Sequence, residues 1–142
     1  MNMIFDAREY LEKFRIRASV QRIAIMDFLI KNRIHPTAED IYNALATQIP
    51  TLSRTTVYNT LKLFEEGGAL MSLSIDERNV RFDVDTSRHA HGKCLKCGKV
   101  YDLPVRDIEK IEIPECPAFS VTEMHLYYKG YCQECGKISP VK

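Results

Sequence analysis

The chain has 142 residues, with 20 Lys and Arg, 19 Asp and Glu, and a formal net charge of +1. This length suits one domain or two small ones. The charge balance excludes a uniformly basic nucleic-acid-binding protein, so any such surface must be a local patch. No apolar run approaches the length of a membrane span and no signal peptide opens the chain, which predicts a cytoplasmic protein.

Helical signals fill the first half of the chain. We expect helices over 6–14, 20–32, 38–48 and 53–66. Each has a side chain near its start that can cap free backbone N–H groups: Asp6, Ser19, Thr37 and Ser53. His35-Pro36 predicts an extended chain before the third helix, because proline disfavours the α conformation in the residue before it.

The last of these helices is the best marked. Val57, Leu61 and Phe64 predict its buried face. A polar face lies opposite: Arg54, Thr55, Tyr58, Asn59 and Lys62. Strands over 70–75 and 80–83 then predict a hairpin. Helices followed by a hairpin are typical of a winged helix-turn-helix, although an ordinary amphipathic helix with a solvated polar face explains 53–66 equally well.

The second half of the chain is rich in strands. Residues 84–88 are mostly polar and lack periodicity, which predicts a hinge. We expect strands over 99–103 and 120–128, with a short helix at 107–111 between them. A region this small needs a metal, and we also expect a partner chain, for stability.

Two repeated cysteine motifs predict a structural zinc site. Cys94 and Cys97 form one C-x-x-C-G-K motif, and Cys132 and Cys135 form the other. Two such pairs supply the four thiolates of a closed tetrahedral zinc site. The fifth cysteine, Cys116, lies outside the pattern and is expected to be an ordinary thiol. The odd cysteine count favours zinc over a set of disulfides.

A looser group of imidazoles and carboxylates suggests a second metal site: His35, Asp83, His89, His91 and Asp102. His89 and His91 point the same way on an extended segment. Imidazoles mixed with carboxylates suit Fe(II), Mn(II) or Zn(II). Scattered surface groups are the alternative. His125, a lone histidine among apolar neighbours, is expected to be structural.

These motifs together resemble the ferric uptake regulator (Fur) family, over roughly residues 10 to 137. In chain order they are His35-Pro-Thr-Ala-Glu-Asp-Ile-Tyr42, Ser53-Arg-Thr-Thr-Val-Tyr-Asn-Thr-Leu61, Arg81-Phe-Asp83, His89-x-His91-x-x-Cys94-x-x-Cys97-Gly-Lys99 and Cys132-x-x-Cys135.

The resemblance implies an α+β fold and a homodimeric bacterial repressor, not an enzyme, that binds operator DNA. A winged helix-turn-helix DNA-binding domain would span 1–83, with the hinge at 84–88. A small α/β dimerisation domain with the four-cysteine zinc would span 89–142. The resemblance places a regulatory Fe²⁺ or Mn²⁺ on the five imidazole and carboxylate residues above.

Aspartate at both carboxylate positions, Asp83 and Asp102, is similar to the peroxide-sensing PerR branch. That similarity implies that peroxide oxidises His35 or His89 and so ends repression. A further metal site of the family is expected to be lost, because its positions hold Arg88, Ala90, Glu109 and Met124. Pro114 and Pro117 are expected to shorten the dimerisation helix.

The resemblance also implies DNA contacts from the polar face of helix 53–66 and from the residue that caps it, with one basic residue reaching the minor groove. These residues are Arg17, Ser53, Arg54, Thr55, Tyr58, Asn59 and Lys62. Three alternatives stay open: an iron- or zinc-responsive repressor without peroxide sensing, a non-haem iron enzyme, and a zinc-stapled adaptor that does not bind DNA.

Overall fold

The structure, a computed structural model, describes residues 6–136. Lys137, the last residue of the second cysteine motif, lies outside them. The chain divides into two compact units, with the boundary between Thr86 and Ser87. None of the helices in the described residues combines the length and apolar character needed to cross a membrane.

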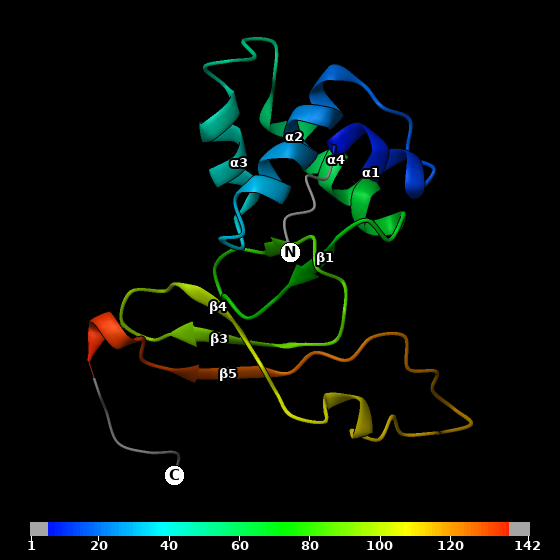
Figure 1. Cartoon of the computed structure of the whole chain (residues 1–142), viewed down its shortest axis with the longest axis vertical. Coiled ribbons are helices and arrows are strands. Elements are labelled where there is room, and N and C mark those ends of the chain that lie inside the picture. Colours follow the sequence, from blue (N-terminus) through cyan, green and yellow to red (C-terminus); the bar gives the residue numbers. More distant parts are fainter. Residues whose placement is uncertain (1–5, 137–142) are drawn as a thin grey trace. The chain divides into compact units, whose positions relative to one another are not determined.

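The first unit, which we call unit 1, is mainly helical (Figure 1). Its elements are α1 (Ala7–Lys13), α2 (Val20–Lys31), α3 (Ala38–Leu45), α4 (Arg54–Glu66), β1 (Met71–Leu73) and β2 (Arg81–Asp83). All four expected caps form, since the side chains of Asp6, Ser19, Thr37 and Ser53 each accept a backbone N–H hydrogen bond. Thr37 and Asp40 complete a reciprocal capping box.

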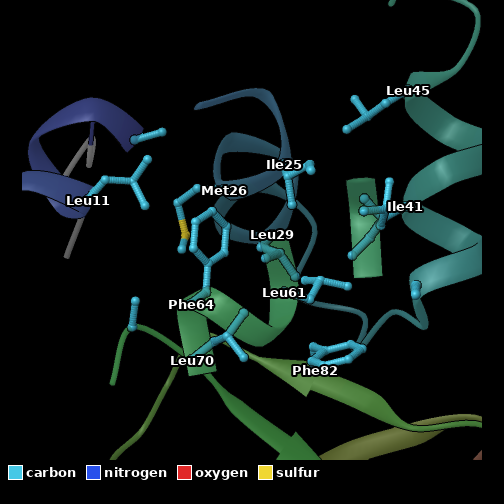
Figure 2. Close-up of a cluster of buried hydrophobic side chains, with 14 of the residues drawn as sticks. Leu11, Ile25, Met26, Leu29, Ile41, Leu45, Leu61, Phe64, Leu70 and Phe82 are labelled. Carbon is cyan, nitrogen blue, oxygen red and sulfur yellow. The ribbon is translucent and has the colours of Figure 1, made fainter. Parts of the chain in front are cut away.

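One apolar core joins the four helices to β2 and to Leu70, the residue before β1 (Figure 2). It includes Leu11, Ile25, Met26, Leu29, Ile41, Leu61, Phe64, Leu70 and Phe82. Burying each such side chain contributes roughly 1.5–3 kcal/mol to folding. Val57, Leu61 and Phe64 all face this core, so the apolar face predicted for α4 is confirmed.

The hairpin is shorter than the sequence predicts. β1 and β2 pair antiparallel over three residues each, with Leu73 opposite Arg81 at the turn end. The Asp76 carboxylate accepts hydrogen bonds from the Arg78 backbone N–H at 3.0 Å and from the Arg81 guanidinium at 3.0 and 3.2 Å. These hydrogen bonds close the turn, and residues 74 and 80 lie outside the paired strands.

The second unit, unit 2, contains a three-stranded sheet in the order β4-β3-β5 (Figure 1). Its elements are β3 (Ala90–Cys94), β4 (Val100–Leu103), the 3₁₀ helix η1 (Ile108–Lys110), β5 (Tyr127–Gly130) and the 3₁₀ helix η2 (Gln133–Cys135). β3 is antiparallel to β4 and parallel to β5.

The strand predicted over 120–128 is wrong for most of its length, because β5 begins only at Tyr127. The parallel pairing of β5 starts at His91, one residue into β3. The Leu126 carbonyl still accepts the His91 N–H at 3.0 Å, but β3 begins at Ala90 and offers no further partner to segment 120–125. The short helix expected at 107–111 is present as η1.

Unit 2 has a small core. The buried apolar side chains among its described residues are Ala90, Cys94, Val100 and Ile108. Several large apolar side chains in the same unit are instead exposed: Leu95, Ile111, Phe119, Tyr128 and Tyr131. Burial of so little apolar surface leaves this unit dependent on other sources of stability.

Candidate metal sites and nucleic-acid interface

The four cysteines of the two repeated motifs meet in unit 2. β3 ends at Cys94, Cys97 follows in the next turn, and Cys132 and Cys135 flank and end η2. All four sulfur atoms lie within 4.8 Å of one another, and the Cys97 and Cys132 sulfurs are 3.8 Å apart. Tetrahedral zinc with bonds of about 2.3 Å places sulfurs about 3.8 Å apart, so the cluster fits zinc.

Hydrogen bonds prepare part of this cluster for a cation. The backbone N–H groups of Cys97 and Cys132 donate to the Cys94 sulfur at 3.5 and 3.4 Å, which lowers the pKa of that thiol to about 6. A hydrogen bond from Tyr101 lowers the pKa of Cys132. A hydrogen bond with Cys132 raises the pKa of Cys135 to about 12.

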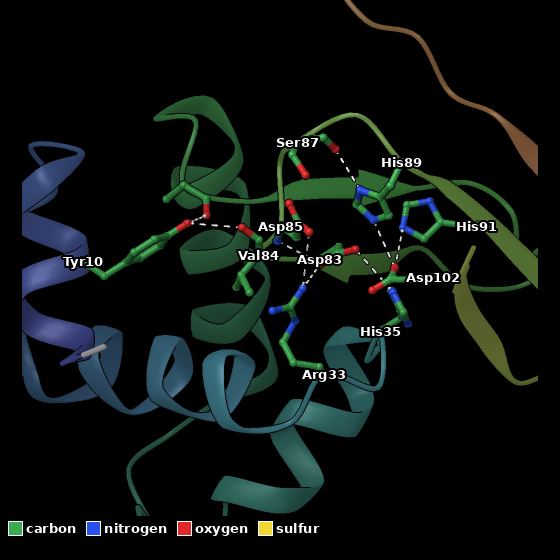
Figure 3. Close-up of polar contacts among 11 residues, drawn as sticks. Tyr10, Arg33, His35, Asp83, Val84, Asp85, Ser87, His89, His91 and Asp102 are labelled. Atoms are coloured by element: carbon green, nitrogen blue, oxygen red, sulfur yellow. Dashed lines mark hydrogen bonds and ion pairs between the residues drawn. The ribbon is translucent and has the colours of Figure 1, made fainter. Parts of the chain in front are cut away.

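Unit 2 also gathers two imidazoles around one carboxylate (Figure 3). Strand pairing sets His91 opposite Asp102. The Nε2 atoms of His89 and His91 lie 3.0 and 3.3 Å from the same oxygen, Asp102 Oδ1.

The tautomer of His89 follows from its other nitrogen. Nδ1 lies 2.8 Å from the Ser87 carbonyl oxygen, which can only accept, so Nδ1 carries the proton. In a neutral ring Nε2 then presents a lone pair to the Asp102 carboxylate. A lone pair that faces a carboxylate needs a proton or a metal cation between the two groups. Imidazole and carboxylate are both ligands for Fe(II), Mn(II) and Zn(II).

Unit 1 holds a second His–Asp pair, in which His35 Nε2 lies 3.3 Å from Asp83 Oδ2 (Figure 3). His35 has φ +55°, so the extended conformation expected before Pro36 is wrong. The Phe82 N–H donates to the Pro36 carbonyl at 3.0 Å, and Arg81 Nη1 donates to the His35 carbonyl at 3.3 Å. These contacts with β2 hold His35 in a conformation that costs a non-glycine residue of order 1–3 kcal/mol, as is common at functional sites.

The other oxygen of Asp83 is also bound within unit 1. Asp83 Oδ1 accepts the Asp85 N–H at 2.9 Å and lies 3.4 Å from Arg33 Nη2. The same Arg33 nitrogen is 3.9 Å from Asp85 Oδ2. Sequence reasoning missed Arg33 and Asp85. Each is a charged residue two positions from an expected ligand, Arg33 from His35 and Asp85 from Asp83, and that spacing is the signal that could have found them.

The five expected metal ligands therefore form two groups, one within each unit. His35 faces Asp83 in unit 1, and His89 and His91 face Asp102 in unit 2. His125 belongs to neither group, since its ring nitrogens lie 2.9 Å from Glu123 Oε2 and 3.2 Å from the Tyr127 hydroxyl. Cys116 is exposed and lies outside the cysteine cluster.

The face of α4 that points away from the core carries the polar side chains expected to contact DNA. Those exposed to solvent are Arg54, Thr55, Tyr58, Asn59 and Lys62. Tyr58 is 57% exposed. A groove of about 560 Å³ lies beside this face and is lined by Arg17, Arg22 and Asn59, among others. Its two cations and open shape suit a phosphate backbone.

Two of the expected DNA contacts are already engaged within unit 1. The Ser53 hydroxyl caps α4 by accepting the Thr56 N–H at 3.1 Å. Arg54 makes a forked pair with Glu39 on α3, at 3.0 to 3.2 Å, and its guanidinium lies 4.4 Å from the Tyr42 ring centre. Sequence reasoning missed Glu39, because a contact across 15 residues leaves no local pattern.

Known proteins resemble this chain over most of its length. The model of the ferric uptake regulator family matches residues 13–129. The peroxide operon regulator of Bacillus subtilis is 38% identical over 134 residues, which cover 93% of this chain and 92% of that protein.

Solved structures extend the comparison. The ferric uptake regulator from Pseudomonas aeruginosa with manganese is 26% identical, with a TM-score of 0.70 and coverage of 92% of this chain and 99% of that one. A second structure is that of PerR from Streptococcus pyogenes, which is described as the structural basis for peroxide sensing and gene regulation by that protein. It is 28% identical, with a TM-score of 0.51 and coverage of 93% of this chain and 95% of that one.

Proposed function

Because the chain belongs to the ferric uptake regulator family, whose members are metal-responsive transcriptional regulators rather than enzymes, we propose that it is a dimeric repressor that senses peroxide. The observation that carries this proposal is the placing of the imidazole and carboxylate ligands: one His–Asp pair in unit 1 and one His–His–Asp group in unit 2. The 38% sequence identity to the peroxide operon regulator of Bacillus subtilis supports peroxide as the signal.

Two metals have separate roles in the proposal. Zn²⁺ is held by Cys94, Cys97, Cys132 and Cys135 and stabilises unit 2. Fe²⁺ or Mn²⁺ is held jointly by the two imidazole and carboxylate groups. A cation bound to both groups would restrict the angle between the units, because each unit supplies part of its ligand set. Without it, the hinge at 84–88 would relax and DNA affinity would fall.

DNA recognition is assigned to α4. Thr55, Tyr58 and Asn59 would meet base edges in the major groove, while Lys62 would hold phosphate. Arg17 would reach the neighbouring minor groove, where narrow A·T-rich sequence attracts arginine. In a dimer, two copies of α4 spaced by about 34–36 Å would reach successive major grooves.

Dimer formation is assigned to unit 2. Its exposed apolar side chains, which include Phe119 at 67% and Leu95 at 54% exposure, suit contact with a second copy of this chain. Such contact would also add to the small core of the unit. Operator binding by this dimer places the protein in the cytoplasm with the DNA.

The peroxide response requires Fe²⁺, which supplies the redox chemistry when bound. His35 and His89 are the imidazoles that would take up the oxygen. One oxygen atom of peroxide would be added to a ring carbon, the ring hydrogen would be lost to the second oxygen, and water would be released. An oxidised imidazole donates poorly to a metal, so the ligand set would be broken and repression would end.

The function is tested by fluorescence anisotropy with DNA selected from a random-sequence pool by the Mn²⁺-loaded protein. We expect binding that needs Mn²⁺ and that is lost in His91→Ala, while zinc content stays at that of the unaltered protein. The matched control is His125→Ala, which removes a histidine outside both ligand groups. Binding that persists without Mn²⁺, or in His91→Ala, would contradict the proposal.

A further inference from the structure

Arg33, which lies two residues before His35, contacts the carboxylate of the expected metal ligand Asp83. We propose that Arg33 is a positioning residue that confines Asp83 to one metal-binding oxygen and weakens the regulatory site. The inference rests on the proposed function, because it concerns the regulatory metal. Figure 3 shows Arg33 reaching toward Asp83 and Asp85 from the end of α2.

The two oxygens of Asp83 have different surroundings in unit 1. Oδ2 lies 3.3 Å from His35 Nε2 and is the oxygen on the ligand side. Oδ1 receives the Asp85 N–H at 2.9 Å and the Arg33 guanidinium at 3.4 Å. Each carboxylate oxygen has two lone pairs, so a metal bound through Oδ1 as well would have to displace one of these two donors. Asp83 is therefore set up to donate through Oδ2 alone.

The charge of Arg33 acts in the same direction. The Asp83 side chain is 1% exposed, and a buried carboxylate needs a compensating charge. Arg33, whose side chain is 46% exposed, supplies it in the metal-free protein. An entering dication must share the carboxylate with this guanidinium, which lowers the gain from binding. Asp85, at 3.9 Å, offsets part of the arginine charge.

Both ends of this arrangement are anchored. The Asn32 backbone and side chain both donate to the Phe28 carbonyl, which fixes the end of α2 directly before Arg33. The Tyr10 hydroxyl lies 2.6 Å from the Ala69 carbonyl and 3.3 Å from the Val84 carbonyl, which holds the chain just after Asp83. The contact therefore joins two fixed points of unit 1.

The test is Arg33→Met, which keeps an unbranched stem and removes the charge. Full-length, zinc-loaded protein is titrated with Mn²⁺, and free Mn²⁺ is followed by electron paramagnetic resonance. We expect binding tighter by on the order of tenfold, opposite in sign to the loss that usually follows replacement of a residue in contact with a metal ligand. Infrared difference spectra upon Mn²⁺ addition should show a carboxylate shifting from one-oxygen toward two-oxygen coordination.

Arg78→Met is the matched control, because it makes the same charge change in the exposed turn of the hairpin. It should leave both readouts unchanged. Unchanged or weaker Mn²⁺ binding in Arg33→Met would overturn the inference, as would an infrared spectrum like that of the unaltered protein. If the unaltered protein binds no Mn²⁺ beyond its zinc, the proposed function fails instead.

Discussion

Arg54 lies on the exposed face of α4, yet its guanidinium donates hydrogen bonds to the Glu39 carboxylate and lies over the Tyr42 ring. The forked hydrogen bond with Arg54 lowers the pKa of Glu39, so the pair stays ionised at neutral pH. A DNA phosphate or guanine must compete with a carboxylate for this arginine. The pair also connects α3 with α4.

At this scale we predict that Glu39→Gln strengthens DNA binding and makes it more sensitive to salt. Releasing one arginine to phosphate should steepen the dependence of log affinity on log salt by about 0.9. The measurement is an anisotropy titration of Mn²⁺-loaded protein at several salt concentrations. Glu66→Gln, at the end of α4, is the control for net charge. Equal slopes in the two variants would show that Glu39 does not restrain Arg54.

The residue scale is also where sequence reasoning was least complete. The ligand set could be proposed because His and Asp at those positions carry recognisable chemistry. Glu39 could not, since it acts through a partner brought near by folding, and the only signal for Arg33 was its place two residues before His35. His35 shows the same limit: the rule for residues before proline favours an extended chain, but contacts with β2 hold a left-handed conformation.

Among the elements, the two cysteine turns determine how the zinc site responds to pH. In the metal-free cluster, Cys94 has a pKa of about 6 and Cys135 a pKa of about 12. At neutral pH, Cys94 is therefore mostly thiolate, whereas Cys135 still holds a proton that zinc must displace. Below pH 6, Cys94 is protonated as well, so zinc must displace more protons.

We therefore predict that zinc affinity rises with pH, and that it rises more steeply below about pH 6 than above it. Competition with a chromophoric chelator, using reduced metal-free protein, measures this slope. Cys116→Ser is the control, because Cys116 lies outside the cluster and its replacement should not alter the slope. An affinity independent of pH in the neutral range would mean that the cluster needs no deprotonation.

Elements governed by local chemistry were predicted well. The helix starts follow from single capping residues, and the face of α4 follows from its own periodicity. The strand expected at 120–128 failed for the opposite reason: the extent of a strand depends on its neighbour, and β3 offers pairing only from His91 onward. The parallel pairing of β3 with β5 joins residues about 36 apart in sequence, beyond the reach of pattern reasoning.

In the molecule as a whole, the two units have different compositions and, in the proposed function, different tasks. Unit 1 has a large core and presents α4, whereas unit 2 has a small core and the cysteine cluster. The proposed regulatory metal draws ligands from both, which is how a local oxidation at one imidazole would alter DNA binding. The order of motifs along the chain was enough to predict a helical unit followed by a strand-rich unit with the cysteine cluster.

The central claim is that peroxide ends DNA binding by oxidising a ligand histidine. Fe²⁺-loaded and Mn²⁺-loaded proteins are each treated with dilute peroxide, then assayed by DNA anisotropy and by peptide mass analysis. We expect the iron form to lose DNA binding in step with one added oxygen on the peptide containing His35 or His89. The manganese form should keep both its affinity and its mass. An iron form that keeps its DNA affinity and its unmodified mass would contradict the claim and favour an iron-responsive repressor.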